Sequence, residues 1–186
     1  MSDATSQVTA ADVDAPAWLR SLVREIPDWP QPGITFRDIT PLLADPDAFR
    51  RCIDELAGRF DAVQVDAVVG VESRGFILAG AIAYRLGAAF VPVRKAGKLP
   101  WAVVREEYEL EYGRAKLEIH RDAIHPDERV LVIDDVLATG GTALATARLV
   151  EALGGAIVGI GLLIEIAGLG GRAAFADRRL EVLATY

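Results

Sequence analysis

Hydrophobic and polar positions recur along this chain with two periods, one typical of strands and one of helices. Apolar runs bounded by polar or glycine-containing turns predict buried strands at residues 65–71, 88–93, 130–133, 157–166 and 180–183. Apolar residues at helical spacing predict helices at residues 18–26, 45–60, 76–86 and 143–153. Because strands that alternate with helices at such intervals usually pair in parallel, we predict an α/β fold with a mostly parallel sheet flanked by helices.

The N-terminal part of the chain is less regular. Residues 1–14 are polar and lack periodicity, so we expect a loose leader there. Three prolines between residues 27 and 32 end the first helix and hold an extended segment, after which residues 34–39 are predicted to form a short strand. The length of 186 residues suits one domain with a substantial core, which we place at residues 15–186.

A polar stretch separates the strands at 88–93 and 130–133. Residues 94–106 contain glycine, proline and several cations, and are expected to form a basic loop. Residues 107–112 and 115–120 alternate between polar and apolar side chains, which predicts two antiparallel strands that turn at Gly113. This alternation puts three glutamates on one face of the first strand: Glu107, Glu109 and Glu111.

Composition and charge narrow the range of functions. Hydrophobic residues make up 52% of the chain, which excludes disorder of the whole chain. The formal net charge of −7 argues against nucleic acid as a partner, since nucleic-acid-binding domains usually carry a basic face. An anionic small molecule is still compatible with this charge, because a binding cleft needs positive charge only locally.

Three features bear on the compartment. The N-terminus lacks the basic and apolar regions of a secretory signal, and no apolar run reaches the roughly 18 residues of a membrane span. The single cysteine, Cys52, has no intrachain partner, and its helical setting predicts a small core residue. We therefore expect a cytoplasmic protein that has no membrane partner.

The most informative segment is residues 130–142, V-L-V-I-D-D-V-L-A-T-G-G-T. Its first four residues predict a parallel strand covered on both faces, and Asp134 and Asp135 would follow at the carboxyl end, where open α/β sheets bind ligands. The loop from Ala138 to Thr142 offers hydroxyls and unhindered N–H groups at a helix start, which suits a phosphate dianion. Carboxylates beside a phosphate suit sugar hydroxyls and a hydrated Mg²⁺.

The common nucleotide-binding loops fit this segment less well. Gly140 and Gly141 permit positive φ, and Thr142 is expected to cap the following helix. A P-loop requires Lys where Thr142 stands, and no G-x-G-x-x-G follows a strand. The alternative that stays open is an ordinary strand–turn–helix with a capping threonine and solvated acids.

Four more segments accompany this loop in the order found in one known family. They are P-Q-P-G-I-T-F-R-D-I-T at 30–40, E-S-R-G-F at 72–76, R-K-A-G-K-L-P at 94–100 and L-E-Y-G at 110–113. With D-D-V-L-A-T-G-G-T they resemble the type I phosphoribosyltransferases, which use phosphoribosyl pyrophosphate (PRPP), and most closely those that act on adenine. The resemblance runs from about Trp18 to the C-terminus and implies the type I phosphoribosyltransferase fold, with a hood at residues 15–45.

The resemblance also implies where PRPP binds. The 5′-phosphate is expected on the loop of Ala138, Thr139, Gly140, Gly141 and Thr142. Asp134 and Asp135 are expected to hold the ribose hydroxyls and the water shell of Mg²⁺, which would have no direct protein ligand. The pyrophosphate is expected on the turn at Glu72 and Ser73, where relatives often have a non-proline cis peptide, and under a mobile loop that carries Arg94, Lys95 and Lys98.

The base is assigned in the same way. The resemblance implies that Phe36 stacks on adenine, that the backbone at Thr35 reads its polar edge, and that Arg37 lies near the pocket or supports it. Adenine presents a 6-amino donor and an N1 acceptor, which complement a peptide C=O and N–H, so oxopurines would leave buried groups unpaired. Phe36 as a simple core aromatic is the alternative at this position.

The resemblance implies catalytic roles for three residues. The L-E-Y-G motif selects Glu111 beside the purine's imidazole edge, with Tyr112 adjacent, and Arg74 is expected on the base and phosphate side of the site. The base must lose its N9 proton as pyrophosphate departs, and a positioned carboxylate can assist this transfer. Spacing alone does not distinguish Glu111 from Glu107 or Glu109.

The expected reaction is adenine + PRPP → AMP + pyrophosphate, with Mg²⁺ as cofactor and a homodimer as the assembly. Two alternatives stay open at this point. The first is transfer to another base, such as hypoxanthine, xanthine or orotate. The second is a non-catalytic PRPP-sensing regulator, which would be expected to add a DNA-binding module, and residues 1–14 are too short for one.

Overall fold

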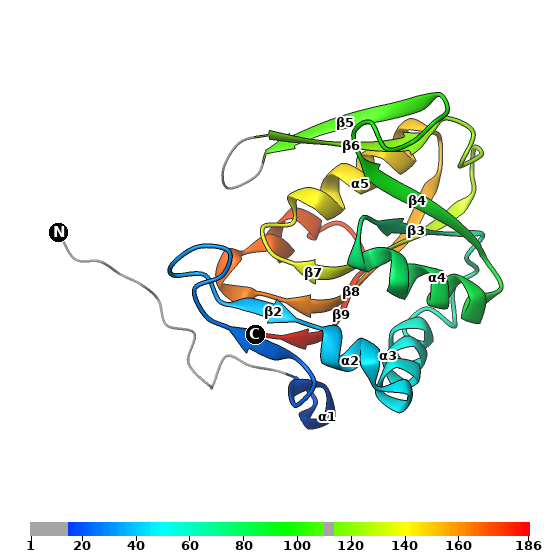
Figure 1. Ribbon diagram of the computed structural model, residues 1–186. Coiled ribbons are helices and arrows are strands. Elements are labelled where there is room, and N and C mark those ends of the chain that lie inside the picture. The colour runs from blue at the N-terminus through cyan, green and yellow to red at the C-terminus, as the bar shows by residue number, and fades with distance from the viewer. Residues whose placement is uncertain (1–14, 110–113) are drawn as a thin grey trace.

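The computed structural model describes residues 15–109 and 114–186 (Figure 1). The predicted leader at 1–14 and the L-E-Y-G motif at 110–113 lie outside the described residues. The strands of the main sheet are β3 (Ala67–Val71), β4 (Ala89–Lys95), β5 (Val103–Glu109), β6 (Arg114–His120), β7 (Arg129–Leu137), β8 (Ala156–Glu165) and β9 (Leu180–Thr185).

Across the described ranges these seven strands form one sheet in the order β5-β6-β4-β3-β7-β8-β9. β3 pairs in parallel with β4 and β7, and β8 pairs in parallel with β7 and β9. β6 pairs antiparallel with β4 and with β5, so the predicted hairpin extends the parallel sheet at one edge. The prediction of an α/β fold with a mostly parallel sheet is confirmed.

Helices cover both faces of the sheet (Figure 1). One face packs against α3 (Pro46–Gly58) and α4 (Arg74–Leu86), and the other packs against α5 (Gly141–Ala152), over which the β5–β6 hairpin folds. Alternate residues of β7 serve the two faces: Leu131 and Ile133 pack on the α3–α4 side, and Val130 and Val132 on the α5 side. This explains why the strand has an uninterrupted apolar sequence.

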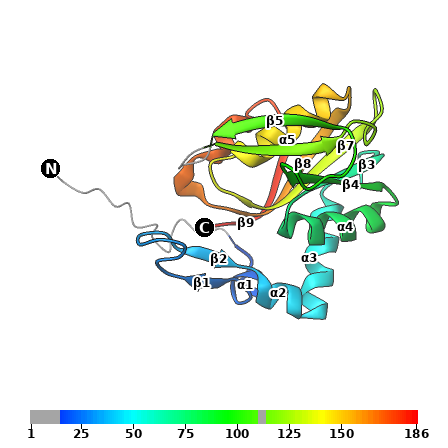
Figure 2. The ribbon, with the colours of Figure 1, turned by 45° about the horizontal axis from the view of Figure 1, so that its top comes forward.

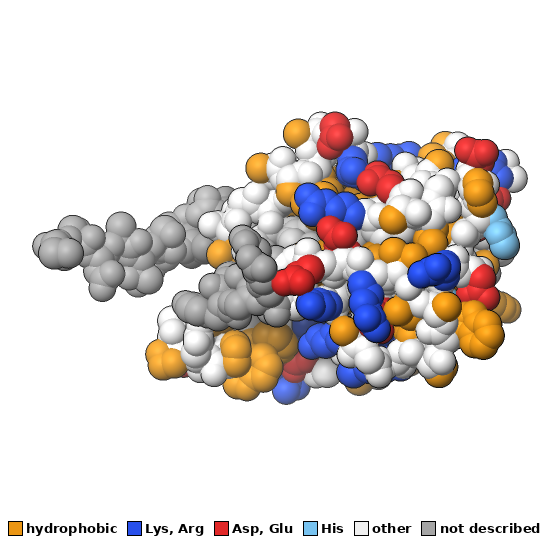
Figure 3. Space-filling model, turned by 90° about the horizontal axis from the view of Figure 1, so that it is seen from above, with side chains coloured by type: hydrophobic (Ala, Val, Ile, Leu, Met, Phe, Trp, Pro, Cys, Tyr) orange, Lys and Arg blue, Asp and Glu red, His pale blue; other side chains and the backbone are white. Residues whose placement is uncertain are grey.

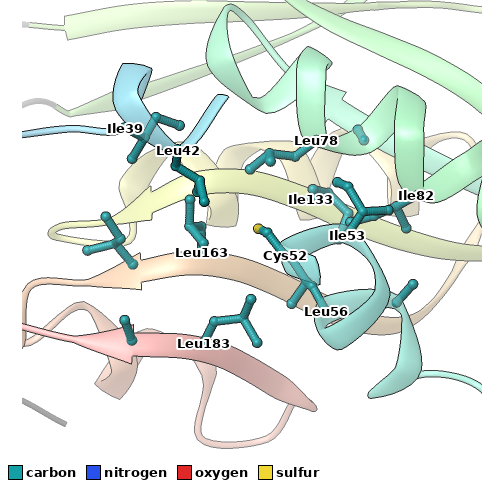
Figure 4. Close-up of a cluster of buried hydrophobic side chains, with 14 of the residues drawn as sticks. Ile39, Leu42, Cys52, Ile53, Leu56, Leu78, Ile82, Ile133, Leu163 and Leu183 are labelled. Atoms are coloured by element: carbon teal, nitrogen blue, oxygen red, sulfur yellow. The ribbon is translucent and has the colours of Figure 1, made fainter. Parts of the chain in front are cut away.

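The core on the α3–α4 side joins helices and strands from the whole chain. Figure 4 shows Leu42, Cys52, Leu78, Leu163 and Leu183 converging from five different elements. Cys52 is fully buried, as predicted, and burial raises the pKa of its thiol to about 12. Asp45 accepts hydrogen bonds from the Asp47 and Ala48 amides and caps α3, which confirms the predicted start of that helix.

The N-terminal segment forms a small unit beside the main sheet (Figure 2). It contains α1 (Ala17–Arg20), β1 (Arg24–Ile26), β2 (Phe36–Asp38) and α2 (Thr40–Ala44). The prediction of one helix over 18–26 is wrong, because the helix ends at Arg20 and residues 24–26 pair antiparallel with β2. The apolar stripe is nevertheless used, since Leu19 and Val23 are both buried in the core.

Several boundaries also differ from the prediction. β4 extends through Lys95, so the basic segment begins inside a strand, and β5 already starts at Val103. β7 continues to Leu137, which puts Asp134 and Asp135 within the strand rather than after it. The chain between β8 and β9 contains two short 3-10 helices, η2 (Ala167–Leu169) and η3 (Gly171–Phe175). Among the described residues, no helix combines the length and the apolar character that crossing a membrane requires.

Candidate active site

The turn after β3 packs directly against β7. A Cβ atom on Gly75, the second residue of α4, would lie 2.7 Å from Asp134 Oδ1 and 3.2 Å from the carbonyl oxygen of Ile133. A larger residue at this position would therefore have to displace the Asp134 carboxylate or move the turn away from β7, so glycine in E-S-R-G permits the close contact with Asp134. The peptide between Glu72 and Ser73 is cis, as the family resemblance implied.

The aspartate pair is buried. Asp134 and Asp135 are 8% and 7% exposed, and Asp134 Oδ1 accepts a hydrogen bond of 2.9 Å from the Asp135 amide. Burial, and next the negative charge of Asp135, raise the pKa of Asp134 well above its usual value. The Arg74 Nε atom lies 2.7 Å from Asp135 Oδ2 and partly neutralises the pair. Such oxygens suit ribose hydroxyls, or a hydrated cation that would restore the charge balance.

The loop after β7 leads into α5 through a left-handed glycine. Gly140 has φ +84° and is the N-cap residue of α5, and a Cβ there would lie 2.9 Å from the carbonyl oxygen of Gly171. The loop therefore packs closely against the first residue of η3. Because the first amides of a helix have no intrahelical partner, residues 141–143 present donors of the kind that bind phosphate.

The prediction that Thr142 caps α5 is wrong. The helix starts at Gly141, so Thr142 lies inside its first turn, and its N-cap residue, Gly140, has no side chain that could cap it. The Thr142 hydroxyl instead lies 3.4 Å from the Tyr108 hydroxyl on β5. Tyr108 was not among the predicted site residues; the alternation puts it on the strand face opposite the glutamates, but does not say which helix that face meets.

The basic segment is gathered around one carboxylate. Glu72 accepts hydrogen bonds from Arg94 Nε and from the Lys95 amide, each 3.2 Å long, and from the Lys98 ammonium. Burial disfavours the charge of Glu72, but these donors outweigh burial and lower its pKa. We predicted a mobile loop here, whereas Arg94 and Lys95 belong to β4 and the following turn is bound to its neighbours. Figure 3 looks onto the side of the molecule that carries the β5–β6 hairpin, where basic and acidic side chains lie next to one another.

The N-terminal segment brings an aromatic ring to the same place. The Arg74 guanidinium lies 4.9 Å from the centroid of the Phe36 ring, and Trp29 packs edge-on against that ring at 4.4 Å. Phe36 is only partly buried, which argues against the simple core aromatic. Thr35, just before β2, is exposed. Arg37 faces elsewhere, since its guanidinium lies 4.9 Å over the Tyr186 ring and 2.5 Å from Glu25.

The structure brings many of the predicted site residues together, and their roles stay predictions. Arg74 joins Asp135 to Phe36, Gly75 joins its own turn to Asp134, and Glu72 joins that turn to the basic segment. Glu111 and Tyr112 lie outside the described residues. Among the residues that the structure does describe, no group of three or more His, Cys, Asp or Glu side chains could hold a metal ion.

A separate hollow of about 520 Å³ lies near the start of β3, lined by Asp61, Val63, Gln64, Val65, Asp66, Arg85, Leu86 and Gly87. Its charged side chains are satisfied, since Arg85 pairs with Asp61 and Asp66 pairs with Arg129. Ligands of open parallel sheets bind at the opposite, carboxyl edge, so the aspartates are the stronger candidate for the active site.

Taken together, the fold and these converging loops define a phosphoribosyltransferase domain, and the phosphoribosyl transferase domain family matches residues 39–178. The adenine phosphoribosyltransferase of Acaryochloris marina is 55% identical over 168 residues, covering 90% of this chain and 99% of that protein. That of Trichormus variabilis is 56% identical over 170 residues, with coverage of 90% and 99%. The chain belongs to the adenine phosphoribosyltransferases.

Solved structures agree with this assignment. The crystal structure of adenine phosphoribosyltransferase from Rhodothermus marinus superposes with a TM-score of 0.87 at 50% identity, covering 90% of this chain and 96% of that one. The Saccharomyces cerevisiae enzyme, crystallised with an imino-altritol bisphosphate and adenine, superposes with a TM-score of 0.84 at 38% identity, with coverage of 89% and 96%. The predictions of family and fold are confirmed.

Proposed function

We propose that the site at the aspartates transfers the phosphoribosyl group of PRPP to adenine, giving AMP and pyrophosphate in purine salvage. The position of Arg74 carries this proposal. Its guanidinium lies 2.7 Å from Asp135 and 4.9 Å over the ring of Phe36, so one side chain spans the proposed ribose and base sites. Transfer requires C1′ of the ribose and N9 of the base to lie within bonding range, and this juxtaposition supports such a geometry.

The 5′-phosphate is proposed to bind residues 138–142. Gly140 turns the backbone through positive φ, and the amides at the start of α5, which follow directly, are available as donors to the phosphate. The hydroxyls of Thr139 and Thr142 add donors of the same kind. The amino end of the helix also favours a dianion there, because aligned peptide dipoles leave partial positive charge at that end.

The ribose hydroxyls are proposed to bind Asp134 and Asp135. When PRPP is bound, Mg²⁺ would neutralise charge on the pyrophosphate and be held through PRPP and water near these carboxylates. The high pKa of Asp134 supports this assignment, because a buried carboxylate with a like-charged neighbour gains most from an approaching cation or hydroxyl donor. The aspartates also tolerate the positive character that C1′ develops as the bond to pyrophosphate breaks.

The pyrophosphate is proposed to bind between the backbone of Glu72 and Ser73 and the cations of Arg94, Lys95 and Lys98. Arg94 and Lys98 already converge on Glu72. Positive charge held in place before the reaction stabilises the departing group without reorganisation during the chemical step. Closing the site over this group excludes water, which would otherwise hydrolyse PRPP.

Adenine is proposed to stack on Phe36, with the Thr35 backbone at its amino edge and Arg37 supporting the hood. As the bond from C1′ to the pyrophosphate oxygen breaks, N9 forms a bond to C1′ and loses its proton. Glu111 is proposed to accept that proton, with Tyr112 and Arg74 beside the base; the roles of Glu111 and Tyr112 rest on the L-E-Y-G motif alone. Family membership supports adenine over hypoxanthine, xanthine or orotate.

A homodimer is proposed as the assembly. Ile77 and Tyr84 are seven residues apart on one face of α4, and they are 45% and 91% exposed. Phe90 on β4 is 41% exposed as well. Large apolar side chains grouped on a surface are typical of protein contacts, and a second copy of this chain is the expected partner.

We also propose that residues 15–45 act as a hood on one domain, and that the enzyme works in the cytoplasm without nucleic acid or membrane partners.

The activity is tested with purified protein, PRPP and Mg²⁺. We expect AMP and pyrophosphate in equal amounts with adenine and far slower product formation with hypoxanthine. Faster transfer to hypoxanthine would remove the substrate assignment, and no pyrophosphate release with any base would remove the enzymatic one.

Sedimentation velocity tests the assembly: the wild type should be a dimer, Tyr84→Glu should shift it toward monomer, and a monomeric wild type would contradict the proposal.

A further inference from the structure

A buried carboxylate with no role in the reaction scheme lies beneath the basic segment. Glu118 on β6 is 1% exposed, although it belongs to an edge hairpin on which Lys116 and Glu107 lie largely in solvent. Its partners in the strand register are Arg94 on β4 and Arg105 on β5. Residues that are paired across antiparallel strands lie on the same face, so Glu118 sits between two arginines.

Of these two arginines, Arg105 binds Glu118. Arg105 Nε lies 2.6 Å from Glu118 Oε1, whereas Arg94 Nε donates to Glu72. The other oxygen of Glu118 accepts a hydrogen bond of 2.9 Å from the backbone N–H of Gly97. Burial disfavours the charge of Glu118, but the donors on Arg105 and Gly97 outweigh it and lower the pKa. A charged group is therefore kept in the interior by one guanidinium and one loop amide.

The loop amide belongs to the centre of the basic turn. Gly97 has φ +83°, a conformation that L side chains rarely adopt, and a hydrogen bond from Ala96 N–H to the Lys116 carbonyl holds the residue before it. On the other side of the turn, Glu72 binds Lys98 and the Lys95 amide. Residues 95–98 are thus held between two carboxylates, Glu72 at the cations and Glu118 at the backbone.

We propose that Glu118 is a positioning residue for the pyrophosphate of PRPP, acting through the Gly97 amide. It fixes the turn so that Lys98 stays beside Glu72 at the end of β3 instead of moving freely in solvent. The proposal rests on the proposed function, which puts the pyrophosphate at that turn. Glu118 itself does not touch the substrate, because it is buried below the segment that does.

A purely stabilising role is less consistent with the contacts of Glu118. The side chain of Arg105 is 64% exposed, and ion pairs with one partner in solvent contribute little to folding. The hydrogen bond to Gly97 N–H, in contrast, acts on a turn of high conformational freedom next to the site. Fixing such a turn before binding removes an ordering cost from the binding step.

The test compares Glu118→Gln with a matched control, Glu151→Gln. Glu151 on α5 pairs with Arg178 at the same distance of 2.6 Å, and the structure places neither of them in the site. In Glu118→Gln a single neutral acceptor replaces two charged oxygens, so the Gly97 amide and Arg105 can no longer both be satisfied. We expect KM for PRPP to rise on the order of tenfold, while KM for adenine changes less than about twofold. Glu151→Gln should retain both wild-type values.

A second readout follows the turn itself. Trypsin cleaves after lysine, so Lys95 and Lys98 report how often the segment opens. Cleavage there should be several-fold faster in Glu118→Gln than in the wild type or Glu151→Gln, and pyrophosphate with Mg²⁺ should slow it. Should Glu118→Gln not fold, Arg105→Gln keeps the carboxylate and removes its exposed partner, and the same two changes are expected with smaller size.

The role of Glu118 would be overturned if folded Glu118→Gln had the wild-type KM for PRPP, or if trypsin cleaved it at the wild-type rate. That result is distinguishable from failure of the proposed function, in which the wild-type protein itself would form no AMP from adenine and PRPP.

Discussion

Replacing Gly75 by alanine tests whether the E-S-R-G turn and the aspartates must touch. A Cβ at this position would lie 2.7 Å from Asp134 Oδ1, 3.2 Å from the Ile133 carbonyl oxygen and 3.3 Å from Asp134 Cα. The last two atoms belong to the backbone of a central strand, and Asp134 Oδ1 is buried and accepts a hydrogen bond from the Asp135 amide, so none of them moves as freely as a surface side chain. Either the turn or the Asp134 carboxylate must move.

The size of that movement follows from the contact distances. Ordinary contact begins at 3.4 Å, so the turn and the carboxylate must separate by roughly 0.7 Å. Overpacking of this kind lowers the free energy of unfolding by about 1–3 kcal/mol. A displacement approaching 1 Å at a reacting group lowers the rate by up to on the order of 10². We therefore expect kcat/KM for PRPP to fall by roughly 10–100-fold.

The matched control is Gly58→Ala at the end of α3, where a Cβ would meet nothing closer than 3.8 Å. This variant should keep wild-type kcat/KM and be neutral or more stable by up to about 1 kcal/mol, because alanine loses less backbone entropy than glycine on folding. Urea unfolding and initial rates of AMP formation measure both quantities. If Gly75→Ala and Gly58→Ala behave alike in both assays, the packing argument is wrong.

Substitutions at three carboxylates test the proposed proton acceptor, the proposed PRPP site and an ion pair that stabilises the fold. Glu111→Gln should lower kcat more than it weakens PRPP binding, since it removes a proton acceptor; steady-state kinetics that show weaker binding with unchanged turnover at saturation would contradict this role. Asp134→Ala should chiefly weaken binding of PRPP with Mg²⁺ in calorimetry, and wild-type affinity would remove Asp134 from the site. Hydrogen bonds from the Arg129 side chain and amide lower the pKa of Asp66 from 3.8 to about 2, so its ionised form stabilises the fold above pH 3.8 and this contribution is lost as the pH falls toward 2. The free energy of unfolding, measured with urea, should therefore fall less steeply with decreasing pH in Asp66→Asn than in the wild type across that range. The same pH dependence in both proteins would refute the linkage.

The sequence predicted the central part of the fold because there the local pattern and the tertiary environment agree. Val130 to Ile133 are apolar on both faces and the strand is covered on both faces. The pattern failed at residues 18–26, where the same apolar stripe is buried by one helical turn and then a strand, a choice made by pairing between β1 and β2. Tertiary pairing of this kind overrides local propensity.

The site shows the same division between local and tertiary information. The motif around Asp134 and Gly140 predicts the phosphate loop, but it does not predict where the helix starts. The left-handed turn at Gly140 starts α5 before Thr142, and that turn packs closely against Gly171. The contacts of Tyr108 and Glu118 depend on how the hairpin folds over α5 and on strand register, which no local spacing encodes.

A crystal structure of this protein with AMP would decide whether the aspartates and the loop after them form one nucleotide site. We expect the phosphate on the amides and hydroxyls of residues 138–142, the ribose hydroxyls on Asp134 and Asp135, and the adenine ring against Phe36. Density that places the phosphate away from that loop, with the ribose out of reach of the aspartates, would contradict the proposed site.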